Sequence, residues 1–375
     1  MKITILSTAY PLRGGIAHFN GLLYKELSKD NQVNVITFKR QYPSIFFPGK
    51  SQFESGETVE NIPSEVIVDS VNPLNWLKVG EKLRKEAPDL IIFKYWMPFF
   101  APCFGTISRI AKRNGKTKVL TICDNVIPHE RKPGDRAFTN YFFNVVDFFV
   151  LLSKKVQQDL LSIKPKAENK ILPHPVYSNF GEVVSKPQAR EHLKLKNNEK
   201  LILFFGFIRD YKGLDVLFET MAQLKGKLDV KLIVAGEFYS NEEKYKELIN
   251  KLQIKDSLYL FTDFIPTNEV KYYFCAADAV ILPYKDATQS GIVQIAMNFK
   301  KPVIATNVGG LEEVVLDTKT GFIVEKQRPE KIAEAIMKFY SSSEDLEKEF
   351  QRNIEGEVDK YSWRKFAEGI TDFMK

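Results

Sequence analysis

Two cationic residues, Arg209 and Lys212, stand between an expected strand and an expected helix. The apolar run Leu201–Phe204 predicts a buried strand, and the apolar spacing of Leu214–Leu224 predicts an amphipathic helix. Gly206 lets the backbone approach a ligand closely at the strand end. Because a helix N-terminus favours anions, two cations placed there suit a diphosphate. The alternative is a solvated basic turn, since so short a motif is weak evidence.

Paired glycines follow an expected strand in each half of the chain. Gly14 and Gly15 come after the first strand, and Gly309 and Gly310 come after a late one. Glycine permits close backbone approach to a ligand, so we expect both pairs to line a donor site. Glu312, or its neighbour Glu313, is a candidate acceptor for ligand hydroxyls. The alternatives are plain turns and, for Glu312, an acid in the first turn of a helix.

Small polar residues between Asp286 and Gln294 lead from a third strand into a helix. Backbone amides at such a helix start bind phosphate or sugar oxygens, which makes Ser290 and Gly291 donor-binding candidates. Asp286 and Gln294 add a carboxylate and an amide. Taken alone, the segment is a generic loop-to-helix entry.

Polar residues also follow the expected strand Lys118–Ile122, in the segment Cys123–Glu130. Ligands of open α/β sheets bind at the carboxyl ends of strands, so Asp124 is a candidate to bind a hydroxyl or orient a neighbour. His129, a lone histidine, is more often structural than catalytic.

The chain alternates strands and helices twice over, which predicts parallel sheets covered by helices on both faces. We expect two Rossmann-like, doubly wound α/β domains, at 1–180 and 195–360, facing across a ligand cleft. The mostly polar segment Tyr177–Lys200 separates them, and a last helix at about 361–375 packs back on the first domain. Expected strands are Lys2–Ser7, Gln32–Phe38, Ser64–Asp69, Leu90–Phe93, Lys118–Ile122, Phe148–Leu152, Leu201–Phe205, Val230–Ala235, Leu258–Phe261, Ala279–Leu282 and Pro302–Thr306.

Composition narrows the class of protein. The 375 residues are 44% hydrophobic and 27% charged, which is typical of a globular protein. Three separated cysteines argue against a disulfide framework or a zinc site. Because the N-terminal segment lacks a signal-peptide pattern and no long apolar run occurs, we expect a cytoplasmic protein without a membrane-spanning helix.

The positive charge is concentrated in the first half. Residues 1–185 hold 25 Lys and Arg against 17 Asp and Glu, whereas the remainder holds 29 against 30. Aromatic stretches at Tyr42–Gly49 and Tyr95–Pro102 lie in this basic half. They suit either peripheral contact with an anionic membrane, on its cytoplasmic face, or a hydrophobic acceptor groove. The alternative is loop packing over a core. No zinc-finger or RNA-binding pattern supports a nucleic-acid partner.

With these residues assembled, the chain resembles the glycosyltransferase family 4 enzymes over nearly its whole length. The resemblance rests on the order and spacing of six segments, at 13–16, 124–130, 206–213, 277–284, 290–297 and 308–313. It implies the two-domain GT-B fold and retaining transfer of a sugar from a nucleotide-diphosphate donor. It also implies an acceptor hydroxyl on a glycan or lipid-linked sugar, and a role in cell-surface polysaccharide or glycolipid synthesis.

The resemblance further implies roles for single residues. Arg209 and Lys212 match the family's diphosphate-binding cations, which offset leaving-group charge without a metal or other cofactor, and Gly15 matches a glycine near the donor phosphate. Two departures stand out. The family's two glutamates, eight positions apart, align without a gap on Ala287 and Ile295, although Asp286 and Gln294 keep that separation one residue earlier. The family's usual histidine is Asp124 here. A non-catalytic nucleotide-sugar-binding protein and a nucleotide-sugar epimerase therefore remain as alternatives.

Overall fold

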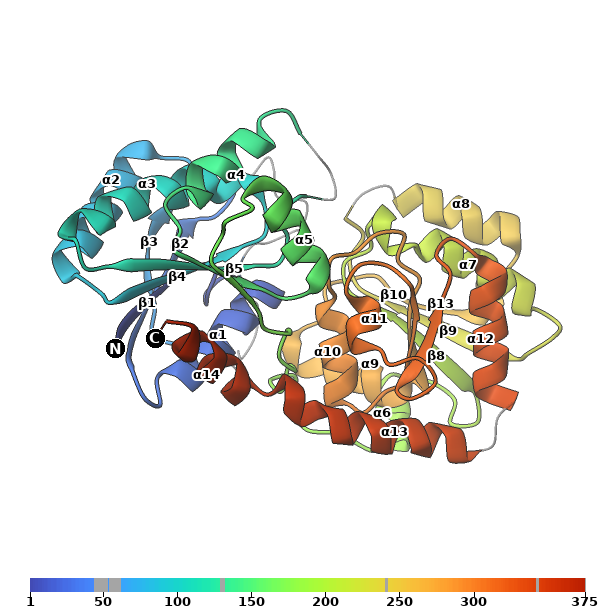
Figure 1. The fold of residues 1–375 in the computed structure, drawn as a ribbon. Coiled ribbons are helices and arrows are strands. Elements are labelled where there is room, and N and C mark those ends of the chain that lie inside the picture. The colour runs from blue at the N-terminus through green and yellow to red at the C-terminus, as the bar shows by residue number, and fades with distance from the viewer. Residues whose placement is uncertain (44–52, 54–61, 129–131, 240–241, 342–343, 375) are drawn as a thin grey trace. The chain divides into compact units, whose positions relative to one another are not determined.

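The computed structural model describes residues 1–43, 53, 62–128, 132–239, 242–341 and 344–374. They form two compact units, each built around its own parallel sheet (Figure 1). Unit 1 comprises Met1–Pro175 and Ser362–Lys375, and unit 2 comprises Val176–Tyr361. The fold prediction of two Rossmann-like parallel-sheet domains is confirmed.

The sheet of unit 1 has the strand order β3-β2-β1-β4-β5-β6-β7, and its neighbouring strands pair in parallel. Its elements in chain order are β1 (Lys2–Leu6), α1 (Gly15–Leu27), β2 (Gln32–Arg40), β3 (Glu65–Asp69), α2 (Pro73–Glu86), β4 (Leu90–Tyr95), η2 (Pro98–Phe100), α3 (Ala101–Ala111), η3 (Lys112–Asn114), β5 (Lys118–Cys123), α4 (Asp135–Phe143), β6 (Phe148–Leu151), α5 (Lys154–Ile163), β7 (Asn169–Ile171) and α14 (Trp363–Phe373).

Helices cover both faces of this sheet, which explains why its central strand β4 is buried along its whole length. Helices α2, α3 and α4 lie together on one face, and α1 lies beside α14 on the other (Figure 1). The α1–α14 contact includes edge-to-face packing of Phe19 on Trp363 and Phe366. Ser362 caps α14 by accepting a hydrogen bond from the Lys365 N–H. The last helix of the chain therefore completes the core of unit 1.

The sheet of unit 2 has the order β10-β9-β8-β11-β12-β13 and is also parallel. Its elements are α6 (Lys186–His192), β8 (Lys200–Phe205), η4 (Asp210–Lys212), α7 (Leu214–Leu224), β9 (Val230–Ala235), α8 (Glu242–Leu252), η5 (Lys255–Ser257), β10 (Leu258–Phe261), η6 (Thr267–Glu269), α9 (Val270–Ala276), β11 (Ala279–Leu282), α10 (Gly291–Asn298), β12 (Val303–Thr306), α11 (Leu311–Val314), β13 (Gly321–Val324), α12 (Pro329–Ser341), α13 (Glu344–Val358) and η7 (Asp359–Tyr361).

Strand order reverses between β8 and β11 in unit 2 and between β1 and β4 in unit 1. In open parallel sheets, the loops at such a reversal diverge and leave room for a ligand at the carboxyl ends of the strands. The loops after β8, β11 and β1 carry most of the residues that the sequence singled out. The reversal of strand order therefore determines where the candidate site residues of each unit lie.

The structure contains short elements that the apolar pattern did not predict: β7, β13 and α6. Helix α6 lies within the segment we expected to separate the domains, and its contacts with α9 place it in unit 2. Its capping box, in which Ser185 and Gln188 exchange hydrogen bonds, starts a helix too short for a clear period. Among the described residues, no helix has the length and apolar character needed to cross a membrane.

Candidate functional site

The loop after β8 begins the site in unit 2. Strand β8 is buried along Leu201–Phe205, and its chain leaves the sheet at Gly206. One turn of 3-10 helix, η4, then delivers Lys212 directly before α7. The sequence predicted this strand, turn and helix, and the apolar residues of α7 are buried as expected.

Backbone contacts tie this loop to the one after β11. A Cβ on Gly213 would lie 2.0 Å from the Pro283 carbonyl oxygen, and Gly213 has a φ of 71°. Only glycine fits this close approach without strain. The Lys285 N–H also donates to the Tyr211 carbonyl oxygen at 2.7 Å. The two loops beside the strand reversal are thus held in register by main-chain atoms.

Arg209 and Lys212 are cations without a carboxylate partner among the residues the structure describes. Lys212 is only 8% exposed, and its Nζ would be 3.1 Å from a Cβ on Gly206. The Arg209 guanidinium lies over the Tyr239 ring, 3.7 Å from its centroid. Burial, with a further contribution from the Arg209 charge, lowers the pKa of Lys212 to about 7. The arrangement concentrates positive charge that an anion would stabilise.

Nearby carboxylates are engaged by other lysines. Asp210 pairs with Lys244 at 2.6 Å, and Asp215 pairs with Lys285 at 2.6 Å. The Lys244 ion pair, the largest favourable cause, lowers the pKa of Asp210. Both carboxylates therefore pair with lysines other than Lys212, which leaves the Lys212 ammonium group for a ligand.

The loop after β11 meets the paired glycines after β12. The Gly310 N–H donates to the Thr288 carbonyl oxygen at 3.1 Å. Gly309 has a φ of 54°, and a Cβ there would lie 1.8 Å from the Ala287 carbonyl oxygen. Ser290 caps α10 by accepting from the Ile292 N–H. The predicted segments around Ser290 and Gly309 are therefore neighbours.

The acidic and amide candidates in these loops differ in exposure. Asp286 and Glu312 are exposed, Gly291 is half-buried, and Gln294 is 1% exposed. Its Oε1 has no hydrogen-bond partner among the described residues. No described contact joins Asp286 to Gln294, so their pairing stays a prediction.

The positions that align without a gap to the family's glutamates are apolar and buried. Ala287 is 2% exposed and Ile295 is 4% exposed. Both side chains belong to the packing of unit 2. Any group that replaces those glutamates must come from another position in the chain.

In unit 1, Gly14 and Asp124 lie at carboxyl ends of strands, as predicted. Gly14 has a φ of 110° and precedes α1, where Gly15 is exposed, and a Cβ on Gly14 would point into open space. Asp124 directly follows β5 and forms an ion pair with the buried Lys94, with Nζ 2.7 Å from Oδ1. Residues 129–131, including His129, lie outside the described residues.

Sequence reasoning missed three side chains that contact these candidates: Tyr239 against Arg209, the Tyr284 ring 6.0 Å from the Lys212 Nζ, and Lys94 beside Asp124. Of these three, only Lys94 could have been noticed from the sequence. A lysine in the middle of the apolar run Leu90–Tyr95 requires a buried partner.

The aromatic stretch Tyr95–Pro102 packs into the core of unit 1. Tyr95 and Phe100 are fully buried, and the Trp96 indole N–H donates to the Tyr42 hydroxyl. Of the interpretations that the sequence left open for this stretch, the structure therefore shows loop packing over a core. Residues 44–49 of the other stretch lie outside the described part of the chain.

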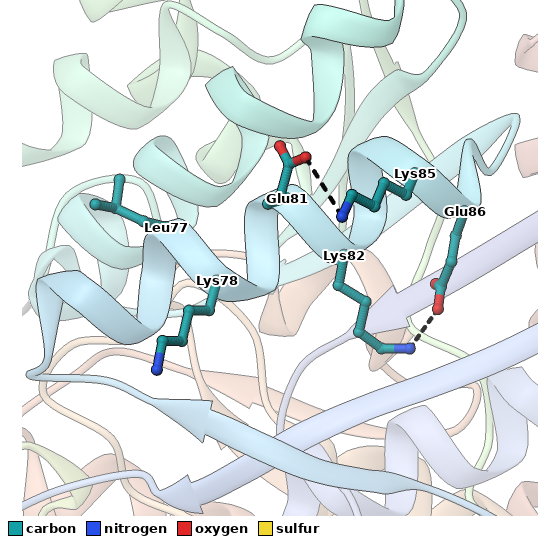
Figure 2. Close-up of a pocket in the computed structure, with 6 residues that line it drawn as sticks. All are labelled: Leu77, Lys78, Glu81, Lys82, Lys85 and Glu86. Atoms are coloured by element: carbon teal, nitrogen blue, oxygen red, sulfur yellow. Dashed lines mark hydrogen bonds and ion pairs between the residues drawn. The ribbon is translucent and has the colours of Figure 1, made fainter.

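A shallow recess on α2 stands apart from the strand ends. It is lined by residues of that one helix, and Lys82 and Lys85 pair with Glu86 and Glu81 there (Figure 2). Such pairs satisfy a solvated helix face. We therefore exclude this recess from the candidate site. Among the described residues, no group of three or more His, Cys, Asp or Glu side chains could hold a metal ion.

The chain is similar in sequence to known glycosyltransferases. The family model described as "Glycosyl transferases group 1" matches residues 185–356. An uncharacterized glycosyltransferase of Methanocaldococcus jannaschii is 25% identical over 99% of this chain and 97% of its own. A D-inositol 3-phosphate glycosyltransferase of Segniliparus rotundus is 30% identical over 49% of this chain and 42% of its own.

Solved structures share the fold over the full chain. The Anabaena protein HepE in complex with UDP has a TM-score of 0.77 at 16% identity, covering 100% of this chain and 99% of that one. A glycosyltransferase from Rickettsia africae has a TM-score of 0.75 at 20% identity, with the same coverage. HepE has also been solved with UDP-glucose, with a TM-score of 0.74 at 16% identity.

Proposed function

We propose that the chain transfers a sugar from a nucleotide-diphosphate donor to an acceptor hydroxyl, since residues 185–356 match the family model of the group 1 glycosyl transferases. The observation that carries the proposal is the pair of cations after β8. The Arg209 charge contributes to lowering the pKa of Lys212, and neither side chain has a carboxylate partner among the described residues. HepE, a structural neighbour, binds UDP and UDP-glucose.

The proposed chemistry is electrostatic. When the bond between sugar and diphosphate breaks, negative charge grows on the leaving phosphate oxygens. A guanidinium and an ammonium fixed beside those oxygens stabilise that charge more in the transition state than in the ground state. We propose that these two groups act without a metal ion, and that transfer retains the configuration of the sugar.

Unit 2 supplies the remaining donor contacts in this proposal. We propose that Ser290 and Gly291 at the start of α10, Gly309 and Gly310 after β12, and Glu312 bind the same ligand as the β8 loop, which is supported by the pairing of β8 with β11 and of β11 with β12. For unit 1, we propose that Gly14 and Gly15 approach the donor phosphate. Asp286 and Gln294 are proposed contacts for the donor sugar or ribose.

Donor binding and turnover test the proposal together. A thermal-shift screen over nucleotide-diphosphate sugars identifies the donor, because a bound ligand raises apparent stability. Slow hydrolysis of that donor is then measured in Arg209→Ala and Lys212→Ala. We expect turnover to fall about 10²–10³-fold in each variant, which is the loss typical of removing one preorganised hydrogen-bond donor from an active site. We also expect the unaltered protein to stay active in EDTA.

The matched control is Lys251→Ala, which removes an exposed cation from the end of α8 in the same unit. It should turn over like the unaltered protein.

Binding without hydrolysis or transfer would instead indicate a nucleotide-sugar-binding protein, and isomerised donor would indicate an epimerase. Proton NMR of the first product gives its anomeric configuration. Near-normal turnover in Lys212→Ala would refute the role assigned to that residue.

We further propose that the acceptor is a glycan or lipid-linked sugar of the cell surface, reached at the cytoplasmic face of an anionic membrane. The excess of Lys and Arg in residues 1–185 supports this, since basic surfaces attract anionic lipids. Flotation with vesicles rich in phosphatidylglycerol measures it. We expect the protein to float with the vesicles at low salt and to be released at high salt. If it does not float with them at low salt, the proposed membrane contact is wrong.

A further inference from the structure

The Arg209 guanidinium lies against an aromatic ring from a neighbouring loop of unit 2. Its Cζ is 3.7 Å from the centroid of the Tyr239 ring. Tyr239 is half-buried and follows β9, the strand that pairs with β8. Among the described residues, no carboxylate pairs with Arg209. A ring face, rather than an ion pair, is therefore the contact that the structure gives this side chain.

Main-chain hydrogen bonds fix Tyr239 beside the loop that carries Arg209. The Ile208 N–H donates to the Glu237 carbonyl oxygen at 2.8 Å, and the Tyr239 N–H donates to the Ile208 carbonyl oxygen at 3.0 Å. Ile208 and Phe238 form a parallel bridge. The pairing of β8 with β9 thus continues beyond both strands, and it sets the position of Tyr239 along the β8 loop.

Helix α8 contacts both of these loops. The Phe238 ring packs against Tyr245 of α8, with ring centroids 5.4 Å apart, and Tyr245 is buried. Lys244, one residue earlier in α8, pairs with Asp210 of the β8 loop at 2.6 Å. The two loops are therefore joined next to the cation–π contact by side chains as well as by their main chains.

A ring suits a phosphate-binding arginine better than a carboxylate would. A carboxylate would neutralise the guanidinium and occupy its N–H donors, whereas an aromatic face attracts the cation and leaves those donors available. The attraction also opposes repulsion from Lys212, whose pKa is lowered to about 7 by burial and by the Arg209 charge. The guanidinium can therefore keep both its charge and its donors while its position is fixed.

We propose that Tyr239 is a positioning residue that holds the Arg209 guanidinium in place to bind the diphosphate of the sugar donor. The inference rests on the proposed function and adds to it a residue outside the β8 loop. Tyr239 touches no ligand in this role and acts through Arg209. The ring carries the effect, and the hydroxyl does not.

Calorimetry with one variant that removes the ring and one that keeps it tests the inference. The probes are UDP-glucose, GDP-mannose and ADP-glucose, and the probe that the unaltered protein binds best is used throughout. We expect Tyr239→Leu to weaken its binding about 3–30-fold, which is the range of a cation–π contact. Tyr239→Phe, which keeps the ring and loses the hydroxyl, should keep most of the affinity.

A second comparison shows whether Tyr239 acts through Arg209. The effects of two residues that act as one unit do not add when both are changed. We therefore expect Tyr239→Leu to cause no further loss of affinity in the Arg209→Ala protein. A ring that contacted the nucleotide directly would lower the affinity in both backgrounds, and that result would overturn the inference.

The charge of Lys212 supplies a readout that a purely structural role would not move. The Tyr284 hydroxyl, whose ring lies 6.0 Å from the Lys212 Nζ, is neutral because burial raises its pKa. Asp210 and Asp215 pair with other lysines. The Arg209 guanidinium is therefore the charge that, after burial, lowers the pKa of Lys212.

Removing the ring should change the pH dependence of affinity. The free protein loses the Lys212 charge as pH rises through about 7, so affinity for a diphosphate should fall above that pH. Without the ring, the guanidinium is no longer held near Lys212 and lowers its pKa less. The fall in affinity should therefore begin at higher pH in Tyr239→Leu than in the unaltered protein.

Tyr141→Leu is the matched control. The Arg109 guanidinium lies over the Tyr141 ring in unit 1, with Cζ 3.8 Å from the ring centroid, and Tyr141 is exposed on α4. This variant removes a contact of the same kind and should bind the probe normally. If Tyr239→Leu does not fold, Tyr239→Met carries the same comparison, because it keeps a long side chain without an aromatic face.

The outcomes separate the two proposals. If the unaltered protein binds none of the three sugar nucleotides, the proposed function fails. If it binds one, and Tyr239→Leu binds that probe as tightly and with the same pH dependence, the inference about Tyr239 is overturned while the proposed function stands. Equal weakening in Tyr239→Phe and Tyr239→Leu would also overturn it.

Discussion

The ammonium group of Lys212 is buried beside the Arg209 guanidinium, and burial and this second charge lower its pKa to about 7. Two neighbouring cations repel each other, and burial removes the water that would stabilise them. A diphosphate reverses both effects, because it brings negative charge to within reach of the two side chains. At the scale of the residue, the site is therefore arranged for a ligand that the protein alone does not supply.

This environment predicts a pH dependence of donor affinity. The free protein loses the Lys212 charge as pH rises through about 7, whereas the bound diphosphate favours the charged form. Affinity for UDP-glucose, whose diphosphate does not titrate in this range, should be constant below that pH and fall above it. Binding at pH 8 should take up close to one proton, which calorimetry in buffers of different ionisation enthalpy measures.

Lys212→Arg is the control for that dependence. An arginine stays protonated throughout the range, so the pH dependence should disappear even if the affinity changes. Affinity that is flat from pH 6 to 9 in the unaltered protein would mean that Lys212 does not carry the charge-sensitive contact.

At the scale of the element, strong periodic patterns predicted most of the fold. Strand β8 and helix α7 were expected because an apolar run and a 3.6-residue period stand side by side in the sequence. β7 and β13 were missed because three or four residues show little alternation. Helix α6 was missed although its capping box is visible in the sequence at Ser185 and Gln188.

The site was predictable only where it depends on strand ends. Parallel strands bring their carboxyl ends to one edge, so the loops at Gly206, Ser290 and Gly309 could be expected to meet. Ring contacts such as Tyr239 on Arg209 depend on the path of a loop, which periodicity does not specify. The contact between Lys94 and Asp124 depends on the neighbour relation of β4 and β5, which a sequence pattern alone leaves open.

At the scale of the whole molecule, the two halves of the sequence divide the charge unevenly. Residues 1–185 carry the whole positive excess, and the remainder is nearly balanced. The balanced half holds the cations Arg209 and Lys212. In our proposal, recognition of the sugar donor therefore depends on the charges of Arg209 and Lys212. Recognition of the acceptor depends on the excess of Lys and Arg spread over residues 1–185.

A crystal structure with the best-binding nucleoside diphosphate tests the central claim most directly. We predict that the pyrophosphate oxygens lie within hydrogen-bond distance of the Arg209 guanidinium and the Lys212 ammonium, beside the Gly206 backbone. A nucleotide bound elsewhere on the chain, or a diphosphate that contacts neither cation, would contradict the account.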